Sequence, residues 1–202
     1  MKDKVVKALF LQASNLKELG RSSEALLSLQ HVRNVATAAG DDATLALSLT
    51  AMSELYGAAG QFEDAMTVAR AAASSASISG CPWIAAYLQG TIGELLRDRS
   101  DYTSAAFAYR AAATKYTELG MDSFAAYTRV LLAETLLLAG YEEDAVSELL
   151  EAAPVIKREN LTREAIVALG LLREAIRHQH ASPEALRELR EQLTRMKEEG
   201  RL

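Results

Sequence analysis

The chain repeats a short pattern every 40 residues, and this repetition limits the folds open to it. The repeated segments all end in Ala: GRSSEA at 20–25, GQFEDA at 60–65, SDYTSA at 100–105, GYEEDA at 140–145 and HASPEA at 180–185. Glycine stands at 20, 40, 60, 80, 120, 140 and 200, Asn160 continues the series, and only Ser100 and His180 break it. Gly and Asn tolerate the left-handed backbone that closes a helix, so these positions predict a helix end every 20 residues.

Between the predicted ends, apolar residues recur at steps of three and four, as in Leu45, Leu49, Met52 and Tyr56. This spacing is helical, and the abundance of Ala favours closely packed helices over strands. We therefore predict an all-α fold of about ten antiparallel helices in five hairpins. The hairpins are expected at about 2–40, 41–80, 81–120, 121–160 and 161–200, within a single domain over 1–202. The charged fifth repeat is expected to be a C-terminal cap.

The order of side chains within each hairpin resembles the tetratricopeptide repeat (TPR) family. A small residue (Ala13, Ser53, Gly93, Ala133) is followed three positions later by a bulky one (Leu16, Tyr56, Leu96, Leu136), and after the turn comes the repeated Ala (Ala25, Ala65, Ala105, Ala145, Ala185). The resemblance implies a right-handed α-α superhelix, or solenoid. Two departures are the 40-residue period, against about 34 in the family, and the replacement of the family's first-helix Trp by Leu9, Leu49, Gln89 and Arg129.

The charge and cysteine content narrow the classes of partner. With 22 Lys and Arg against 27 Asp and Glu, the net charge of −5 argues against nucleic acid, including reading of RNA by helical repeats. No apolar run approaches the roughly 18 residues of a membrane span. Cys81 is the single cysteine, so an internal disulfide is excluded. We expect a cytoplasmic protein with no membrane partner.

Signatures of catalysis are lacking in the sequence. It contains no Gly-Lys-Ser/Thr phosphate loop and no HExxH motif. His178 and His180 are two residues apart on a predicted helix and would point to different sides, and Cys81 has no His near it in sequence. We expect no enzyme activity, no metal and no cofactor. A helical enzyme with an unrecognised site is the least favoured alternative.

A column of glutamates recurs at the 40-residue step in the first helix of each hairpin: Glu54, Glu94, Glu134 and Glu174. The TPR resemblance implies that this helix lines a concave surface where peptides or partner helices bind. Tyr87 and Tyr127 form a shorter column in the same helices, and Arg97 is assigned to the same surface. The glutamate column would suit a basic or amphipathic segment.

An alternative interpretation is that the glutamate column is neutralised within the protein. Arg97 and Arg177 follow Glu94 and Glu174 by three residues, a spacing that permits ion pairs within a helix. Arg70, Arg110 and Arg190 recur in the second helices and could reach the same carboxylates. The column would then be inherited from duplication of the repeat.

The first helix carries Val5, Val6 and Phe10, which would normally meet a preceding helix in a repeat array. These residues predict that this end abuts a second copy of the chain, as a homodimer, or further repeats of a longer array. The alternative is that they face their own hairpin.

Taken together, the features predict a non-catalytic protein-protein interaction scaffold that binds a peptide or partner segment in the concave groove. The alternative function is a peptide- or effector-sensing TPR regulator that acts on a separate output partner.

Overall fold

The computed structural model describes residues 2–159 and 170 of the chain. Over these residues the backbone forms helices joined by short turns, with no strand, so the prediction of an all-helical chain is confirmed for this part. The helices are α1 (Lys2–Glu18), α2 (Ser22–Ala39), α3 (Asp42–Ala58), α4 (Phe62–Ser79), α5 (Pro82–Asp98), α6 (Tyr102–Glu118), α7 (Asp122–Leu138) and α8 (Glu142–Arg158). The expected fifth hairpin at 161–200, with Glu174, Arg177, His178, His180, Ala185 and Arg190, lies outside the described residues.

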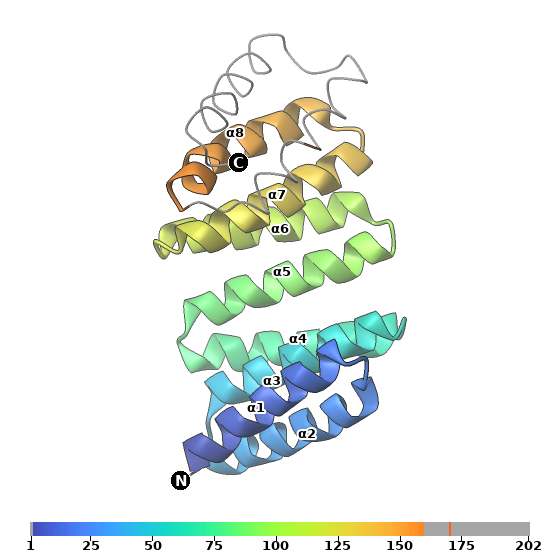
Figure 1. The fold of residues 1–202 in the computed structure, drawn as a ribbon, viewed down its shortest axis with the longest axis vertical. Helices are drawn as coiled ribbons and strands as arrows, with labels where there is room; N and C mark the ends of the chain where they lie inside the picture. Colours follow the sequence, from blue (N-terminus) through green and yellow to red (C-terminus); the bar gives the residue numbers. More distant parts are fainter. Residues whose placement is uncertain (1, 160–169, 171–202) are drawn as a thin grey trace. The chain divides into compact units, whose positions relative to one another are not determined.

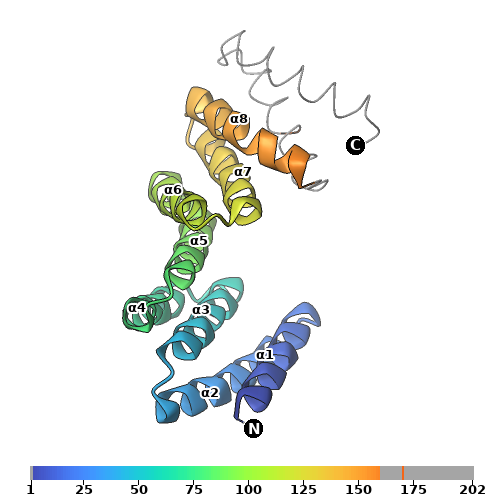
Figure 2. The same ribbon diagram turned by 90° about the vertical axis from the view of Figure 1, so that its left-hand side faces the viewer.

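The structure divides into two compact units, Met1–Leu95 and Leu96–Leu202, with the division inside α5. In the first unit, α1 packs against α2, α2 against α3 and α3 against α4 (Figures 1 and 2). In the second unit, α7 packs against both α6 and α8. Helices α1, α3, α5 and α7 begin at residues 2, 42, 82 and 122, which reproduces the 40-residue step of the sequence.

Six of the seven positions at the 20-residue step from 20 to 140 are Gly with positive φ, and the seventh, Ser100, adopts φ +61°. The hydrogen bonds repeat as well. Gly40 N–H donates to Thr37 O, and Asp41 N–H donates to Ala36 O. Ser100 N–H and Asp101 N–H donate to Arg97 O and Leu96 O in the same pattern. This is the Schellman arrangement that closes a helix in the left-handed conformation, so Ser100 ends α5 as glycine ends α1–α4, α6 and α7.

Two aspartates begin helices by capping them. The Asp41 carboxylate accepts a hydrogen bond from Thr44 N–H at 3.0 Å, and the Asp101 carboxylate accepts one from Ser104 N–H at 3.2 Å. Such caps satisfy one of the free N–H groups of the first turn. Hydrogen bonds from Thr44, first through its side chain and then through its backbone, hold the pKa of Asp41 below its ordinary value.

The core of each unit is built around the repeated alanines. Ala25 and Ala65 in the first unit, and Ala105 and Ala145 in the second, are fully buried. In the first unit the buried Ser53 hydroxyl donates to Ala65 O at 2.9 Å, which joins α3 to α4 where they cross. Small side chains let two helix backbones approach, and larger neighbours fill the space around them.

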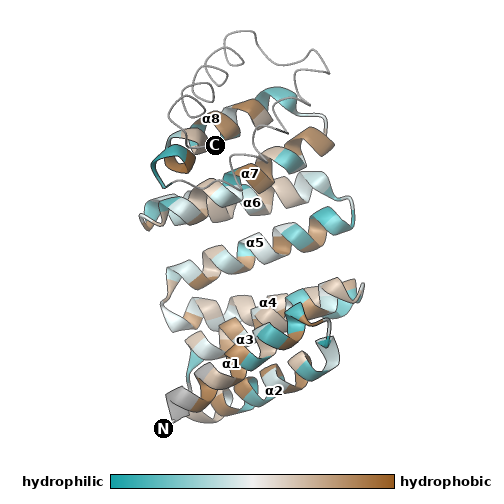
Figure 3. Ribbon diagram, in the orientation of Figure 1, coloured by the Kyte–Doolittle hydropathy of each residue, from teal (hydrophilic) through white to brown (hydrophobic). Residues whose placement is uncertain are grey.

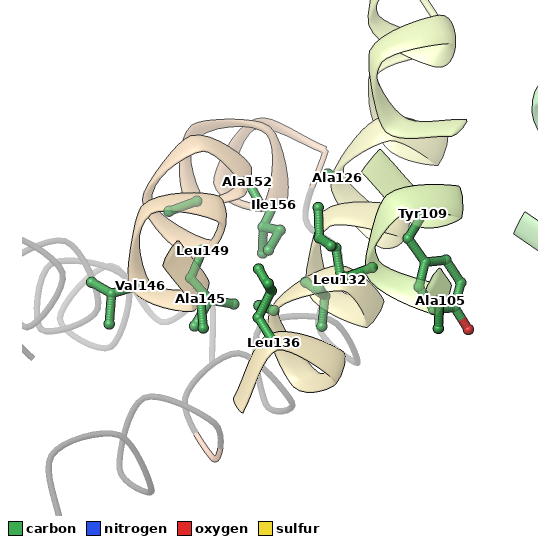
Figure 4. Close-up of a cluster of buried hydrophobic side chains, with 14 residues drawn as sticks. Ala105, Tyr109, Ala126, Leu132, Leu136, Ala145, Val146, Leu149, Ala152 and Ile156 are labelled. Atoms are coloured by element: carbon green, nitrogen blue, oxygen red, sulfur yellow. The ribbon is translucent and has the colours of Figure 1, made fainter. Parts of the chain in front are cut away.

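The larger neighbours are clearest in the second unit (Figure 4). There Leu132 and Leu136 of α7 face Leu149 and Ile156 of α8, and Tyr109 of α6 is buried in the same cluster. The rings of Tyr116 and Phe124 add a contact between α6 and α7, with centroids 5.4 Å apart. The second unit therefore has a continuous apolar core of its own.

Hydrophobic residues are most concentrated on α3 and α7, whereas α8 carries both hydrophobic and hydrophilic stretches (Figure 3). None of the described helices combines the length and apolar character required to cross a membrane.

Candidate functional site

The first unit contains a pocket of about 400 Å³ between α1, α3 and α5, the first helices of three successive hairpins. One face of α1, one face of α3 and single residues of α2 and α5 line it: Phe10, Ala13, Ser14, Lys17, Leu29, Leu47, Ala51, Glu54, Leu55 and Tyr87. The α1 and α3 residues are three or four positions apart, so each helix presents one stripe to the pocket. Most of the wall is apolar, and the polar groups are few.

Glu54 of α3 joins three helices at one side of this pocket. Lys17 Nζ of α1 donates to Glu54 Oε2 at 2.7 Å. From α5, the Tyr87 hydroxyl donates a short hydrogen bond to Glu54 Oε1, and Thr91 Oγ1 donates to the same oxygen at 3.4 Å. An ionised carboxylate only accepts hydrogen bonds, so this arrangement matches one acceptor group to donors from both neighbouring helices.

The two charges of the pair differ in their access to solvent. The Lys17 side chain is 49% exposed, and the Glu54 side chain is 16% exposed. Glu54 is shielded by the groups that donate to it, whereas Lys17 uses one N–H donor on Glu54 and keeps about half of its side chain in contact with solvent. Lys17 is therefore the more accessible of the two charged groups at this pocket.

A second pair of the same kind lies in the second unit. Arg97 Nη1 donates to Glu134 Oε2 at 3.2 Å. The two residues are 37 positions apart, as Lys17 and Glu54 are, and they occupy the same positions of the repeat. In both pairs the basic side chain comes from the last turn of one first helix and the carboxylate from the C-terminal half of the next.

In the repeat that lies between those of Lys17 and Arg97, the equivalent position is Gly57, which belongs to the first unit. A Cβ atom added to Gly57 would lie 2.3 Å from Leu95 Cδ2. Leu95 thus occupies the space that a side chain at 57 would need. Leu95 of α5 therefore leaves no room for a basic side chain at this repeat position.

Glu148 of α8, which is not in the glutamate column, has 13% of its side chain exposed and forms a further ionic group among the described residues of the second unit. Arg129 donates to Glu148 Oε2 at 2.5 Å and pairs with Glu151 at 2.8 Å, and Arg110 Nε lies 3.4 Å from Glu148 Oε1. Arg110, which the sequence suggested could reach the glutamate column, is thus paired with α8. These contacts join α6, α7 and α8 and serve packing of the second unit.

The remaining predicted residues are more dispersed. Glu94 is half-buried on α5, and Tyr127 is exposed on α7. Of the residues predicted to abut another chain, Val5 is exposed, Val6 is half-buried, and Phe10 packs on the core of its own unit and lines the pocket. The structure therefore brings Phe10, Glu54 and Tyr87 together in one place.

Lys17 and Thr91 complete the site and were missed by the sequence reasoning. The signal in the sequence was a basic residue at the same repeat position in two hairpins, Lys17 and Arg97, but it did not identify Glu54 and Glu134 as their partners. As for metals, the described part of the chain holds no group of three or more His, Cys, Asp or Glu side chains placed to bind an ion.

Comparison with known structures identifies the fold. No protein-family model matches the sequence, and no match to a curated protein was found. A crystal structure of a Podosopora anserina protein assigned as a kinesin light chain, with nearly identical TPR-like repeats, matches with a TM-score of 0.72 at 13% identity, over 96% of both chains. A crystal structure of a substituted variant of that same protein matches with a TM-score of 0.71 at 13% identity, over 96% of this chain and 95% of that one. The chain has a TPR-like repeat fold, and the family resemblance noted in the sequence is confirmed at the level of the fold.

Proposed function

We propose that the chain is a non-catalytic protein-interaction scaffold that binds a partner segment on the surface formed by the first helices of its hairpins. The TPR-like repeat fold suggests a scaffold of this class. The observation that carries the proposal is the pocket between α1, α3 and α5, because it lies on these first helices and combines apolar walls with a few polar groups. We place this binding in the cytoplasm, since Cys81 is the single cysteine of the sequence.

The partner segment is amphipathic and places an apolar side chain in the pocket. Phe10 and Leu47 are partly exposed and offer apolar contact, and binding energy in interfaces concentrates where a large side chain fills such a pocket. A basic side chain fits less well at this point, because Glu54 is 16% exposed and already accepts hydrogen bonds from three side chains. The basic segment expected from the glutamate column is therefore not the occupant that we propose for this pocket.

The second candidate function is a regulator that senses a peptide or effector and acts on a separate output partner. The size of the pocket favours it, since about 400 Å³ falls within the range of sites for small ligands. In this function, occupation of the pocket would change how α1, α3 and α5 contact one another.

Selection of peptides from a displayed random library tests the proposed function. Peptides that bind the wild-type protein should carry a large apolar residue, and Ala51→Phe, which fills the pocket, should abolish their binding. The matched control is Ala111→Phe, which makes the same substitution at an exposed position of α6, and it should bind the peptides normally. Equal binding to the Ala51→Phe variant, with its helical circular dichroism unchanged, would move the interaction to another surface.

A further inference from the structure

We propose that the pocket between α1, α3 and α5 binds a small monocarboxylic acid with an apolar body, and that Lys17 holds its carboxylate. This inference rests on the pocket used in the proposed function and names a ligand class for it. The ligand would act on the same surface as the partner segment, so the acid would compete with that segment.

The apolar part of the ligand is argued from the walls of the pocket. Phe10 and Leu47 are partly exposed and supply large apolar side chains, Leu29 and Leu55 form almost fully buried parts of the wall, and the small Ala51 keeps the interior open. Sites for small ligands have this composition, with mostly apolar walls and a few polar groups that fix orientation. Burial of an alkyl or aryl group here would supply most of the affinity.

The charge of the ligand is argued from the Lys17 and Glu54 pair. The Lys17 ammonium has three N–H donors, and Glu54 takes one of them at 2.7 Å. With 49% of its side chain exposed, Lys17 can turn its remaining donors toward a ligand in the pocket. Glu54 offers little to a cationic ligand, because Tyr87 and Thr91 also donate to it.

Glu54 opposes a carboxylate ligand but does not cancel the attraction of Lys17. A carboxylate bound to the free side of Nζ lies in direct contact with the ammonium, while Glu54 is on the other side of the same atom. Coulomb energy falls with distance, so the attraction at the shorter distance exceeds the repulsion at the longer one. Removal of the Glu54 charge should therefore strengthen binding of an acid and weaken binding of an amine.

The test compares three eight-carbon probes with different head groups: octanoate, octan-1-ol and octylamine. Binding is followed by nitrogen-15 NMR titration of the wild-type protein at pH 7 and fixed ionic strength. We expect octanoate to bind roughly tenfold more tightly than octylamine, which is the effect of one charge-assisted hydrogen bond. Shifts should centre on the backbone signals of Lys17, Ala51 and Tyr87.

Three variants separate the effect of the charge on binding from the effect of the pocket. Lys17→Met keeps the apolar stem and should weaken octanoate by roughly three- to tenfold while leaving octan-1-ol unchanged. Glu54→Gln should tighten octanoate by roughly twofold or more. Ala51→Phe should abolish binding of all three probes, and the helical circular dichroism of each variant shows whether it remains folded.

Several outcomes would overturn the inference: no binding of octanoate, equal or tighter binding of octylamine, or weaker octanoate binding in Glu54→Gln. If octanoate fails to bind while selected peptides still need the open pocket, the acid ligand is wrong and the proposed function stands. If octanoate binds as expected and no peptide needs the pocket, the acid ligand stands and the scaffold function fails at this site.

Discussion

Lys17 at the end of α1 contacts Glu54 in the C-terminal half of α3 at 2.7 Å, across the boundary between two hairpins. The contact joins repeat units that are neighbours in the array, and Arg97 and Glu134 repeat it 80 residues later. Each pair needs two hairpins to be in place, so it forms only when adjacent repeats dock.

A double-mutant cycle with Lys17→Met and Glu54→Gln should give a coupling energy of about 1 kcal/mol in the free energy of urea unfolding. This value is at the upper end for exposed pairs, because Glu54 is mostly shielded. The coupling should fall as salt rises, since the Lys17 side is solvated. The control pair is Lys115 and Glu118, three residues apart on exposed α6, with an expected coupling of roughly 0.2–0.5 kcal/mol. Coupling within error of zero for Lys17 and Glu54 would contradict the docking role.

Ser100→Gly should stabilise the second unit by about 1 kcal/mol. Ser100 has φ +61°, a left-handed conformation that costs an ordinary L-residue about this amount and glycine almost nothing. Gly40→Ala is the reciprocal control and should destabilise the protein, since Gly40 has φ +64°. Thermal and urea unfolding of the two variants against wild type measures both effects. A Ser100→Gly variant less stable than wild type would show that the serine side chain stabilises this turn.

Substitution of two helical glycines by alanine should have unequal effects. Gly90 lies in α5 with open space around its Cα, so Gly90→Ala should stabilise the protein by roughly 0.5–1 kcal/mol. Gly57→Ala gains the same helix propensity but places Cβ against the buried Leu95, and we expect it to be at least about 1 kcal/mol less stable than Gly90→Ala. Urea unfolding of the two variants under one condition measures the difference, and equal stabilities would show that Leu95 moves aside freely.

Tyr116 should make the protein lose stability in alkali. Burial between α6 and α7 raises the pKa of its phenol to about 12, whereas the unfolded chain ionises near its ordinary value of 10.0. The neutral form is favoured in the folded state, so the contribution of Tyr116 is fully present below pH 10 and is lost as pH rises toward 12. Tyr116→Phe should therefore have a shallower decline of unfolding free energy between pH 10 and 12. Parallel declines for wild type and variant would mean that Tyr116 ionises without unfolding.

The helices were predictable because their ends are encoded locally. Gly40 and its equivalents need only their own backbone conformation to close a helix, and Asp41 needs only the first turn that follows it. The repeated alanines were predictable for a related reason, since a small residue at a fixed repeat position indicates a helix crossing. Ser100 interrupts the series of glycines in the sequence, but its backbone has the same left-handed conformation as those glycines.

The site was only partly predictable because its contacts depend on distances between helices. The two columns that contain Glu54 and Tyr87 could be found from the repeat, and these two side chains do meet. The donor from Lys17 could not be assigned, since an ion pair 37 residues apart in sequence needs the spacing and rotation of two helices. Likewise, nothing in the sequence shows that Leu95 fills the space beside Gly57.

The fully buried alanines at 25, 65, 105 and 145 have a consequence for how such a chain can change over evolutionary time. A single added methyl group at one of them meets packed neighbours, whereas gain or loss of a whole 40-residue unit presents the same side chains at each new junction. Gain or loss of a whole repeat should therefore disturb the packing less than replacement of one of these four alanines by a slightly larger residue. Lineages of this repeat should vary in the number of units while the crossing residue stays small.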